Sequence, residues 1–391
     1  MDMAVAAKNA NQQAPEVSRR AYSNKEIAKE ALCDIAAQFD GFDTAIICLF
    51  ISPQYRSFAL AEQILQVFGE KTVYACTTAG ELFEGGYSEA SITAFGLDAR
   101  YFDISAVFFE NISDATVESV TGRVLEAKRL LTRSSHSDQN DFAMLLVDGL
   151  TKQEDRLLTY INPVLGSIPL FGGSAADGLD FNESQIYANG KLHRDAALLL
   201  LVRTVCHRRV FQFAHFQPTG IRMVVTRADR DNRIVYSIND EPAGPEYARL
   251  VGKDPDALSE FVFAENPVAV NIGGRSYVRA IQQVREDGSL QFFCAIDEGM
   301  VLNLAEPEDI YQHLRDSLAT LYTEQSPQTI IAFDCILRRL VESDDAINGN
   351  LSKLISEHPV VGFNTYGEQL NIVHVNQTFT GLAIYPPIES A

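Results

Sequence analysis

The stretch KTVYACTTAGELF (71–83) decides the fold, because two related stretches recur, IPLFGGSAADGLDF (168–181) and PVVGFNTYGEQL (359–370). Each has a short apolar or β-branched strand, followed by a loop of small residues in which a glycine adjoins a carboxylate. Glycine permits a turn with positive φ, and the carboxylate is suited to cap backbone N–H groups. The recurrence indicates a duplicated unit.

The flanks of the three stretches repeat as well. An apolar strand precedes each one, a helical stretch follows that strand, and a further apolar strand follows the loop. These segments are the strands 44–52, 142–149 and 329–337, the helices 58–69, 155–166 and 350–358, and the strands 91–97, 196–202 and 380–386. Near-continuous apolar strands separated by helices are typical of sheets covered on both faces. We therefore expect an α/β fold, in which repeated strand-helix-strand-loop-strand units form mixed sheets covered by helices.

A β-rich stretch lies between the second and third units. It contains five predicted strands and two predicted helices. The strands are 211–217, 221–228, 233–239, 276–284 and 290–296, and the helices are 245–252 and 307–322. Residues 1–24 have no apolar period and are predicted to be a mobile tail. A boundary near Asn239 gives two modules, 25–238 and 239–387, which are intimately packed and expected to share sheets.

Composition excludes several classes of function. A net charge of −20 disfavours binding to nucleic acid. The longest apolar runs, such as 196–202, are too short to span a membrane, and no secretory signal is visible, which favours a cytoplasmic protein with reduced, buried cysteines.

Catalytic signatures are also missing. The sequence lacks CxxC, GxGxxG, GxxxxGK[ST] and GxSxG, and no Ser or Cys has a base at a recognisable spacing. Cys335 lies beside Arg338 and Arg339, which would lower the pKa of an accessible thiol, but a buried structural cysteine is the preferred interpretation. We expect no enzymatic activity.

Three of the seven histidines have surroundings that suit a ligand. His215 lies on an aromatic strand with Phe213 and next to Phe216, and strand alternation places Phe213 and His215 on one face. An imidazole on an apolar face is what a b-type haem pocket needs. His374 and His193 each follow a glycine–carboxylate loop. A hydrogen-bonded structural role is the alternative for each of them.

Taken together, the motifs resemble the FIST family (F-box and intracellular signal transduction), which has paired N- and C-terminal modules. The residues that carry this resemblance are TTAGE (77–81), GGSAADGLDF (172–181), the PTG…VVTRAD…PA stretch (218–243), FDCILRR (333–339) and VVGFNTYGEQ (360–369). The resemblance implies a sensory module for small molecules such as amino acids. Bacterial members often accompany histidine kinases and cyclic-di-GMP enzymes.

A narrower resemblance rests on AHFQPTGIRMVVTRADRDNRIV (214–235), which is similar to the haem-binding, nitric-oxide-sensing branch of the family. It implies haem b held by His215, or else by His374 or His193, with Phe213 and Phe216 beside it. It also implies a partner histidine kinase or cyclic-di-GMP enzyme, while a homodimer is left open. The alternative is a haem-free amino-acid sensor that uses the loops through Gly80, Glu81, Asp177, Gly178, Arg338, Gly367 and Glu368. A scaffold without any ligand is the other alternative.

Overall fold

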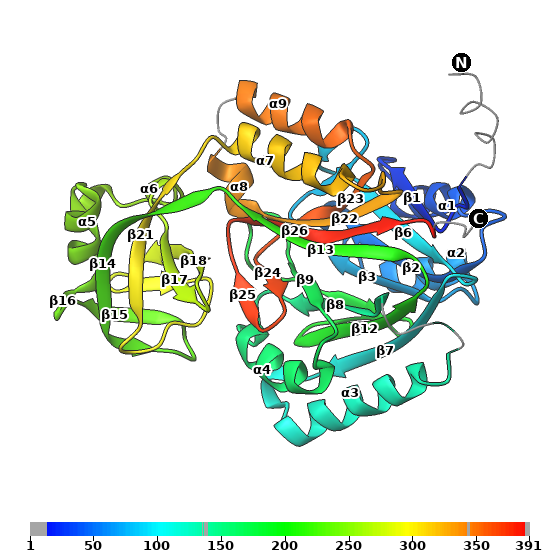
Figure 1. The fold of residues 1–391 in the computed structure, drawn as a ribbon, viewed down its shortest axis with the longest axis horizontal. Coiled ribbons are helices and arrows are strands. Elements are labelled where there is room, and N and C mark those ends of the chain that lie inside the picture. Colours follow the sequence, from blue (N-terminus) through cyan, green and yellow to red (C-terminus); the bar gives the residue numbers. More distant parts are fainter. Residues whose placement is uncertain (1–13, 135, 137–139, 342–344, 388–391) are drawn as a thin grey trace, which may run out of the picture.

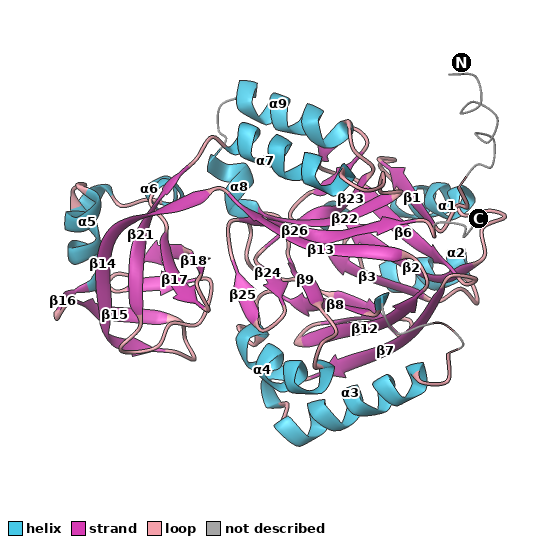
Figure 2. Cartoon of the chain, viewed as in Figure 1, coloured by secondary structure: helices cyan, strands magenta, loops and turns pink. Residues whose placement is uncertain are grey.

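The computed structural model describes residues 14–134, 136, 140–341 and 345–387. These residues form a body and a smaller lobe, residues 216–307, which lies to the left in Figure 1. The body contains three six-stranded sheets, and the lobe contains an eight-stranded sheet. Figure 2 shows that the body's helices lie outside its strands. The α/β class with mixed, helix-covered sheets is confirmed.

The body consists of three units with one strand order. In each unit two parallel strands are joined through a helix, and antiparallel strands complete one side of the sheet. The first unit contains β1 (Ser18–Ser23), α1 (Ala28–Gln38), β2 (Thr44–Ile51), α2 (Leu60–Phe68), β3 (Val73–Thr77), β4 (Glu81–Phe83), β5 (Gly86–Ser88) and β6 (Ile92–Asp98). The second contains β7 (Phe102–Glu110), α3 (Val117–Leu131), β8 (Phe142–Asp148), α4 (Glu154–Leu165), β9 (Leu170–Ala175), β10 (Ile186–Ala188), β11 (Lys191–His193) and β12 (Ala196–Thr204). The third contains β13 (His207–Ala214), α7 (Ile310–Ala319), β22 (Thr329–Cys335), α8 (Ile336–Val341), α9 (Asp345–Ser356), β23 (Val360–Thr365), β24 (Glu368–Leu370), β25 (Val373–Val375) and β26 (Thr378–Tyr385).

The units exchange hairpins in a closed cycle. The hairpin β4–β5 of the first unit pairs with β23 of the third, β24–β25 of the third pairs with β9 of the second, and β10–β11 of the second pairs with β3 of the first. Strands on either side of Asn239 in sequence therefore belong to the same sheets. Each exchanged hairpin follows one of the three glycine–carboxylate loops, so the exchange brings those loops together.

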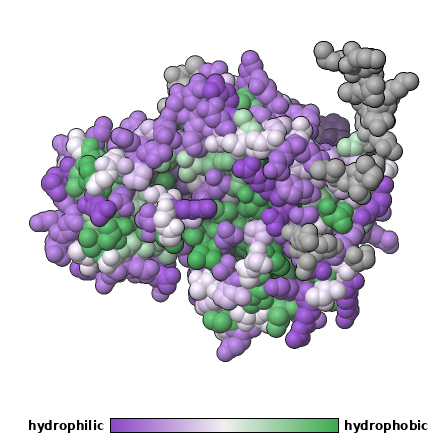
Figure 3. All heavy atoms as spheres, viewed as in Figure 1, coloured by the Kyte–Doolittle hydropathy of each residue, from purple (hydrophilic) through white to green (hydrophobic). Residues whose placement is uncertain are grey.

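The body is built around one aromatic core that all three sheets share. Phe50 on β2, Phe171 on β9 and Phe333 on β22 are fully buried and belong to one apolar cluster. The helices pack on the outer faces, where α1 and α2 cover the first sheet, α3 and α4 the second, and α7 and α9 the third. Most of the face drawn in Figure 3 is hydrophilic, with hydrophobic patches between the hydrophilic side chains.

The lobe has a second core, formed around residues such as Met223, Tyr247 and Leu302, which also includes Val373 and Val375 of β25 in the body. Its elements are β14 (Phe216–Asp229), β15 (Ile234–Ile238), β16 (Glu241–Pro242), α5 (Ala243–Val251), α6 (Glu260–Glu265), β17 (Val268–Ile272), β18 (Arg275–Arg279), β19 (Ile281–Val284), β20 (Leu290–Phe292) and β21 (Val301–Pro307). It interrupts the third unit after β13, so the β-rich stretch is an insertion in that unit and does not separate it from the second. Asn239 lies in the turn between β15 and β16, within the lobe.

Part of the predicted tail is ordered. Residues 18–23 form β1, which pairs with β6 and buries Ala21, so the prediction of a tail was wrong for this segment. Residues 1–13 lie outside the described part of the chain. Within the described ranges, no helix is both long and apolar enough to cross a membrane.

Candidate functional site

The three glycine–carboxylate loops meet where the parallel strands end. Backbone hydrogen bonds join each loop to a neighbouring unit, from Ala79 N to Asn364 O (2.9 Å), from Gly178 N to Thr78 O (3.1 Å) and from Ser174 N to Gly367 O (2.8 Å). The carboxyl ends of parallel strands are where open α/β sheets bind ligands. The backbone therefore brings the three loops together.

All three loop carboxylates are buried, and two of them accept hydrogen bonds from hydroxyl groups of their own units. Glu81 accepts hydrogen bonds from the hydroxyls of Thr78 and Ser91, and Glu368 accepts them from Thr365 and Thr378. Burial raises the pKa of Glu81 to about 7 and that of Glu368 to about 8, although these hydroxyls oppose the shift. The two side chains fasten the ends of the exchanged hairpins and do not face a cavity.

These raised pKa values predict a pH-dependent stability. Between the usual value of 4.5 and the folded value near 7 or 8, the folded chain keeps a proton that the unfolded chain has released. Stability contributed by each site is therefore lost as pH rises through that window. We expect Glu81→Gln and Glu368→Gln to leave the free energy of unfolding similar at about pH 4.5. At about pH 9 we expect Glu81→Gln to raise it by roughly 3 kcal/mol and Glu368→Gln by roughly 5 kcal/mol.

The measurement is denaturant unfolding of each variant and the wild type at several pH values. Glu84→Gln serves as the control, because this carboxylate is 61% exposed. A wild-type chain that gains stability relative to both Gln variants between pH 5 and pH 8 would contradict the raised pKa values.

Asp177 closes the second loop. Its Oδ2 accepts hydrogen bonds from the backbone N–H groups of Asn182 (2.9 Å) and Glu183 (2.6 Å), and its Oδ1 accepts one from the hydroxyl of Tyr366. The nearest guanidinium nitrogen of Arg56 lies 3.8 Å from Oδ2. Asp177 thus links the second loop to the third, in the capping role considered for it.

An open cavity of about 460 Å³ lies between the first loop, the second loop and the start of α8. Gly80 and Gly178, two of the predicted residues, line it. The other lining residues were not singled out as ligand contacts from the sequence, and they are Ser52, Pro53, Gln54, Ala79, Glu89, Ala90, Leu179, Ile336 and Arg339. Among the places where the predicted residues lie, this cavity is the best candidate for a ligand site. It is accessible, and its lining combines apolar walls with polar groups.

Arg339 supplies a positive charge to this cavity. Its Nη2 donates to Glu89 Oε1 at 2.6 Å, and its guanidinium lies 5.7 Å from the ring centre of Tyr87. A Cβ on Gly80, which has φ +126°, would collide with Arg339 Nη1, so glycine at position 80 makes room for the guanidinium. Glu89 is 75% exposed, so solvent or a ligand can replace it. A guanidinium is the side chain best suited to bind a carboxylate through two hydrogen bonds.

Arg338 faces away from the cavity. It is 1% exposed, and it donates to Asp334 Oδ1 and to His215 Nδ1, both at 2.7 Å. Burial and the Arg338 charge lower the pKa of His215 to about 2, with a further contribution from His313. Because a guanidinium can only donate, His215 Nδ1 accepts and the ring proton lies on Nε2.

His215 is therefore poorly arranged to bind haem iron. A metal-binding histidine normally donates its second ring N–H to an acceptor, whereas Nδ1 of His215 faces a donor. The predicted aromatic partners also have other contacts. Phe213 stacks on Phe211 with ring centres 4.7 Å apart, while Phe216 lies against His215 at 4.1 Å and packs with lobe residues.

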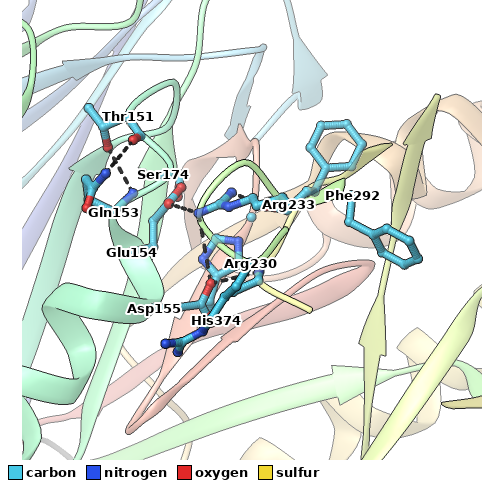
Figure 4. Close-up of polar contacts among 12 residues, drawn as sticks. Thr151, Gln153, Glu154, Asp155, Ser174, Arg230, Arg233, Phe292 and His374 are labelled. Atoms are coloured by element: carbon cyan, nitrogen blue, oxygen red, sulfur yellow. Dashed lines mark hydrogen bonds and ion pairs between the residues drawn. The ribbon is translucent and has the colours of Figure 1, made fainter. Parts of the chain in front are cut away.

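His374 belongs to a buried polar cluster between body and lobe, which we call the junction cluster. Figure 4 shows it with Glu154, Asp155 and Arg233, and Arg279 belongs to it as well. Arg233 pairs with Glu154, and Asp155 lies 3.9 Å from Arg233 and 3.8 Å from Arg279, beyond hydrogen-bond range. The described residues offer no hydrogen-bond partner to several buried atoms here, namely Arg233 Nε, Arg279 Nε, Gln369 Oε1, His374 Nε2, Asn376 Nδ2 and Gln377 Oε1.

The junction cluster fits a haem poorly, since a haem pocket needs apolar walls. His374 is surrounded by guanidinium, carboxylate and amide groups. The third candidate, His193, has both ring nitrogens 3.3 Å from oxygen atoms, those of Glu110 and Ala188. Within the described ranges, no group of three or more His, Cys, Asp or Glu side chains is placed to hold a metal ion.

The remaining predictions concern cysteine. Burial raises the pKa of Cys335 well above its usual range, so the buried structural role is supported. All six cysteines are free thiols, and five of them are buried. Cys33 is exposed, which corrects the expectation of uniformly buried thiols, because it lies on the outer face of α1.

A search of curated proteins found no match to this chain. Two family models do match, the FIST N domain over residues 45–241 and the FIST C domain over residues 243–371. FIST domains are sensory modules of signal transduction that bind small ligands. On the extent of these matches, the chain belongs to the FIST family.

Proposed function

We propose that this protein is a cytoplasmic sensor that binds a small α-amino acid in the cavity beside Gly80 and Arg339, without haem. The observation that carries the proposal is a guanidinium in an accessible cavity of about 460 Å³, paired with an exposed carboxylate that a ligand can replace. The cavity lies between the first and the second of the repeated loops. Its role is recognition, and no nucleophile with an adjacent base lines it.

The charges beside the cavity favour a ligand that carries both signs. The ligand carboxylate would take the place of Glu89 on Arg339, through two parallel N–H···O bonds. Glu89, released from Arg339, would remain close enough to pair with the ammonium group. Ser52 Oγ already accepts from Ala90 N at 3.0 Å, so its hydroxyl hydrogen is left to donate to the ligand.

Thermal-shift measurements with matched ligand sets test this proposal. Each of the twenty α-amino acids is compared with its amide, which lacks the carboxylate, and with its α-hydroxy acid, which lacks the ammonium. We expect at least one amino acid to stabilise the chain, by ~2.7 kcal/mol at ~100 times its Kd, and both analogues to stabilise it less. If the amide stabilises the chain as strongly as the amino acid, the assignment of Arg339 is wrong.

A haem-based nitric oxide sensor is the second proposal, and one observation favours it. His374 Nε2 is fully buried, and none of the described residues offers it a hydrogen-bond partner. Haemin titration followed by the Soret band separates the two proposals. We expect no stoichiometric Soret band. If a stoichiometric band forms and His374→Ala removes it, the haem proposal holds in place of the amino-acid proposal. In either case we propose that a separate histidine kinase or cyclic-di-GMP enzyme receives the signal.

A further inference from the structure

Two adjacent arginines in the last turn of α8 face different parts of the molecule. Arg339 lines the cavity and holds Glu89. Arg338 is buried and holds His215 and Asp334. Because consecutive residues of one short helix make both sets of contacts, a displacement of Arg339 is transmitted to Arg338 through the backbone between them.

His215 lies where both connections to the lobe cross. It separates β13 of the body from β14 of the lobe, and its backbone oxygen accepts from Glu308 N at 2.7 Å. The returning strand β21 pairs with β14 at this point, with Phe216 opposite Pro307. In Figure 1 these two strands lead from the body into the lobe. The contact of Arg338 with His215 therefore acts on the hinge of the lobe.

A second contact leads from the cavity to the same hinge. Tyr87, two residues before Glu89, donates its hydroxyl to Asp334 Oδ2 at 2.5 Å, and Asp334 holds Arg338. The guanidinium of Arg339 lies over the ring of Tyr87. A change at Glu89 thus reaches Arg338 both through α8 and through Tyr87 and Asp334.

We propose that Arg338 and Arg339 couple occupancy of the cavity to the position of the lobe, so that the lobe carries the output of the sensor. This inference rests on the proposed function. The coupling requires that the lobe can take two positions relative to the body and that the ligand binds more tightly when the lobe is in one of them.

Hydrogen exchange of the full chain tests the coupling without any ligand. Glu89→Gln weakens the hold on Arg339 as displacement by a ligand would. We expect it to speed exchange of the amides of residues 216, 217, 219, 304–306 and 308 by a factor of about 3 to 10. Glu84→Gln, an exposed carboxylate on the same hairpin that pairs with Arg20, should leave those amides unchanged.

Variants at His215 show whether the route runs through Arg338. His215→Asn keeps an acceptor for Arg338, so the effect of Glu89→Gln should persist in that background. His215→Leu removes the acceptor, so the effect should disappear. An effect of equal size in the His215→Leu background, or no effect in the wild type, would overturn the coupling. Neither result depends on amino-acid binding, so failure of the coupling is distinguishable from failure of the proposed function.

Discussion

Phe333→Ala is expected to lower the free energy of unfolding by about 3–5 kcal/mol, the cost of deleting a large side chain from a core that cannot close around the cavity. Phe333 is fully buried at the centre of the body. Its ring centre lies 5.9 Å from that of Phe50, 5.6 Å from that of Phe171 and 5.1 Å from that of Phe363. Since these rings come from all three sheets, one substitution weakens every unit at once.

Urea unfolding of the variant, followed by far-UV circular dichroism, measures this loss. Phe58→Ala provides a matched control, since Phe58 is fully exposed and its removal should change stability by no more than about 0.5 kcal/mol. A loss below about 1 kcal/mol for Phe333→Ala would mean that the three sheets do not share one core.

Much of the body was predictable because its pattern is local. The strands that become β2, β8 and β22 are near-continuous apolar runs, and the predicted helices correspond to α2, α4 and α9. The hairpin exchange was not predictable, because β4, β10 and β24 are each three residues long and periodicity does not specify a partner strand. The strand β1 was missed for a similar reason. Four of its six residues are serine or arginine, and its burial comes from pairing with β6.

The site was predictable only as a region. The glycines of two of the loops lie beside the candidate site, because Gly80 and Gly178 line the cavity. The sequence does not show that Glu81 and Glu368 already accept hydrogen bonds from hydroxyl groups. Their partners Ser91 and Thr378 lie ten residues further along the chain, outside the local motif. Arg339 was noted only as a neighbour of Cys335, since nothing in FDCILRR indicates which of the two arginines faces the cavity.

The orientation of the His215 ring could not be predicted from the sequence either. Strand alternation relates it to Phe213, but the chain leaves β13 at Ala214, so alternation no longer determines where its ring points. Arg338, more than a hundred residues away, then decides which ring nitrogen carries the proton.

Isothermal titration of the amino acid that gives the largest thermal shift, against wild type and Arg339→Gln, tests the central claim most directly. Glutamine keeps a polar side chain but cannot form a charged, two-point contact with a carboxylate. We expect an affinity loss of about 10- to 100-fold, in line with hydrogen bonds to a charged group. Arg315→Gln, on the exposed face of α7, should bind like the wild type. Equal affinities of wild type and Arg339→Gln would contradict the account.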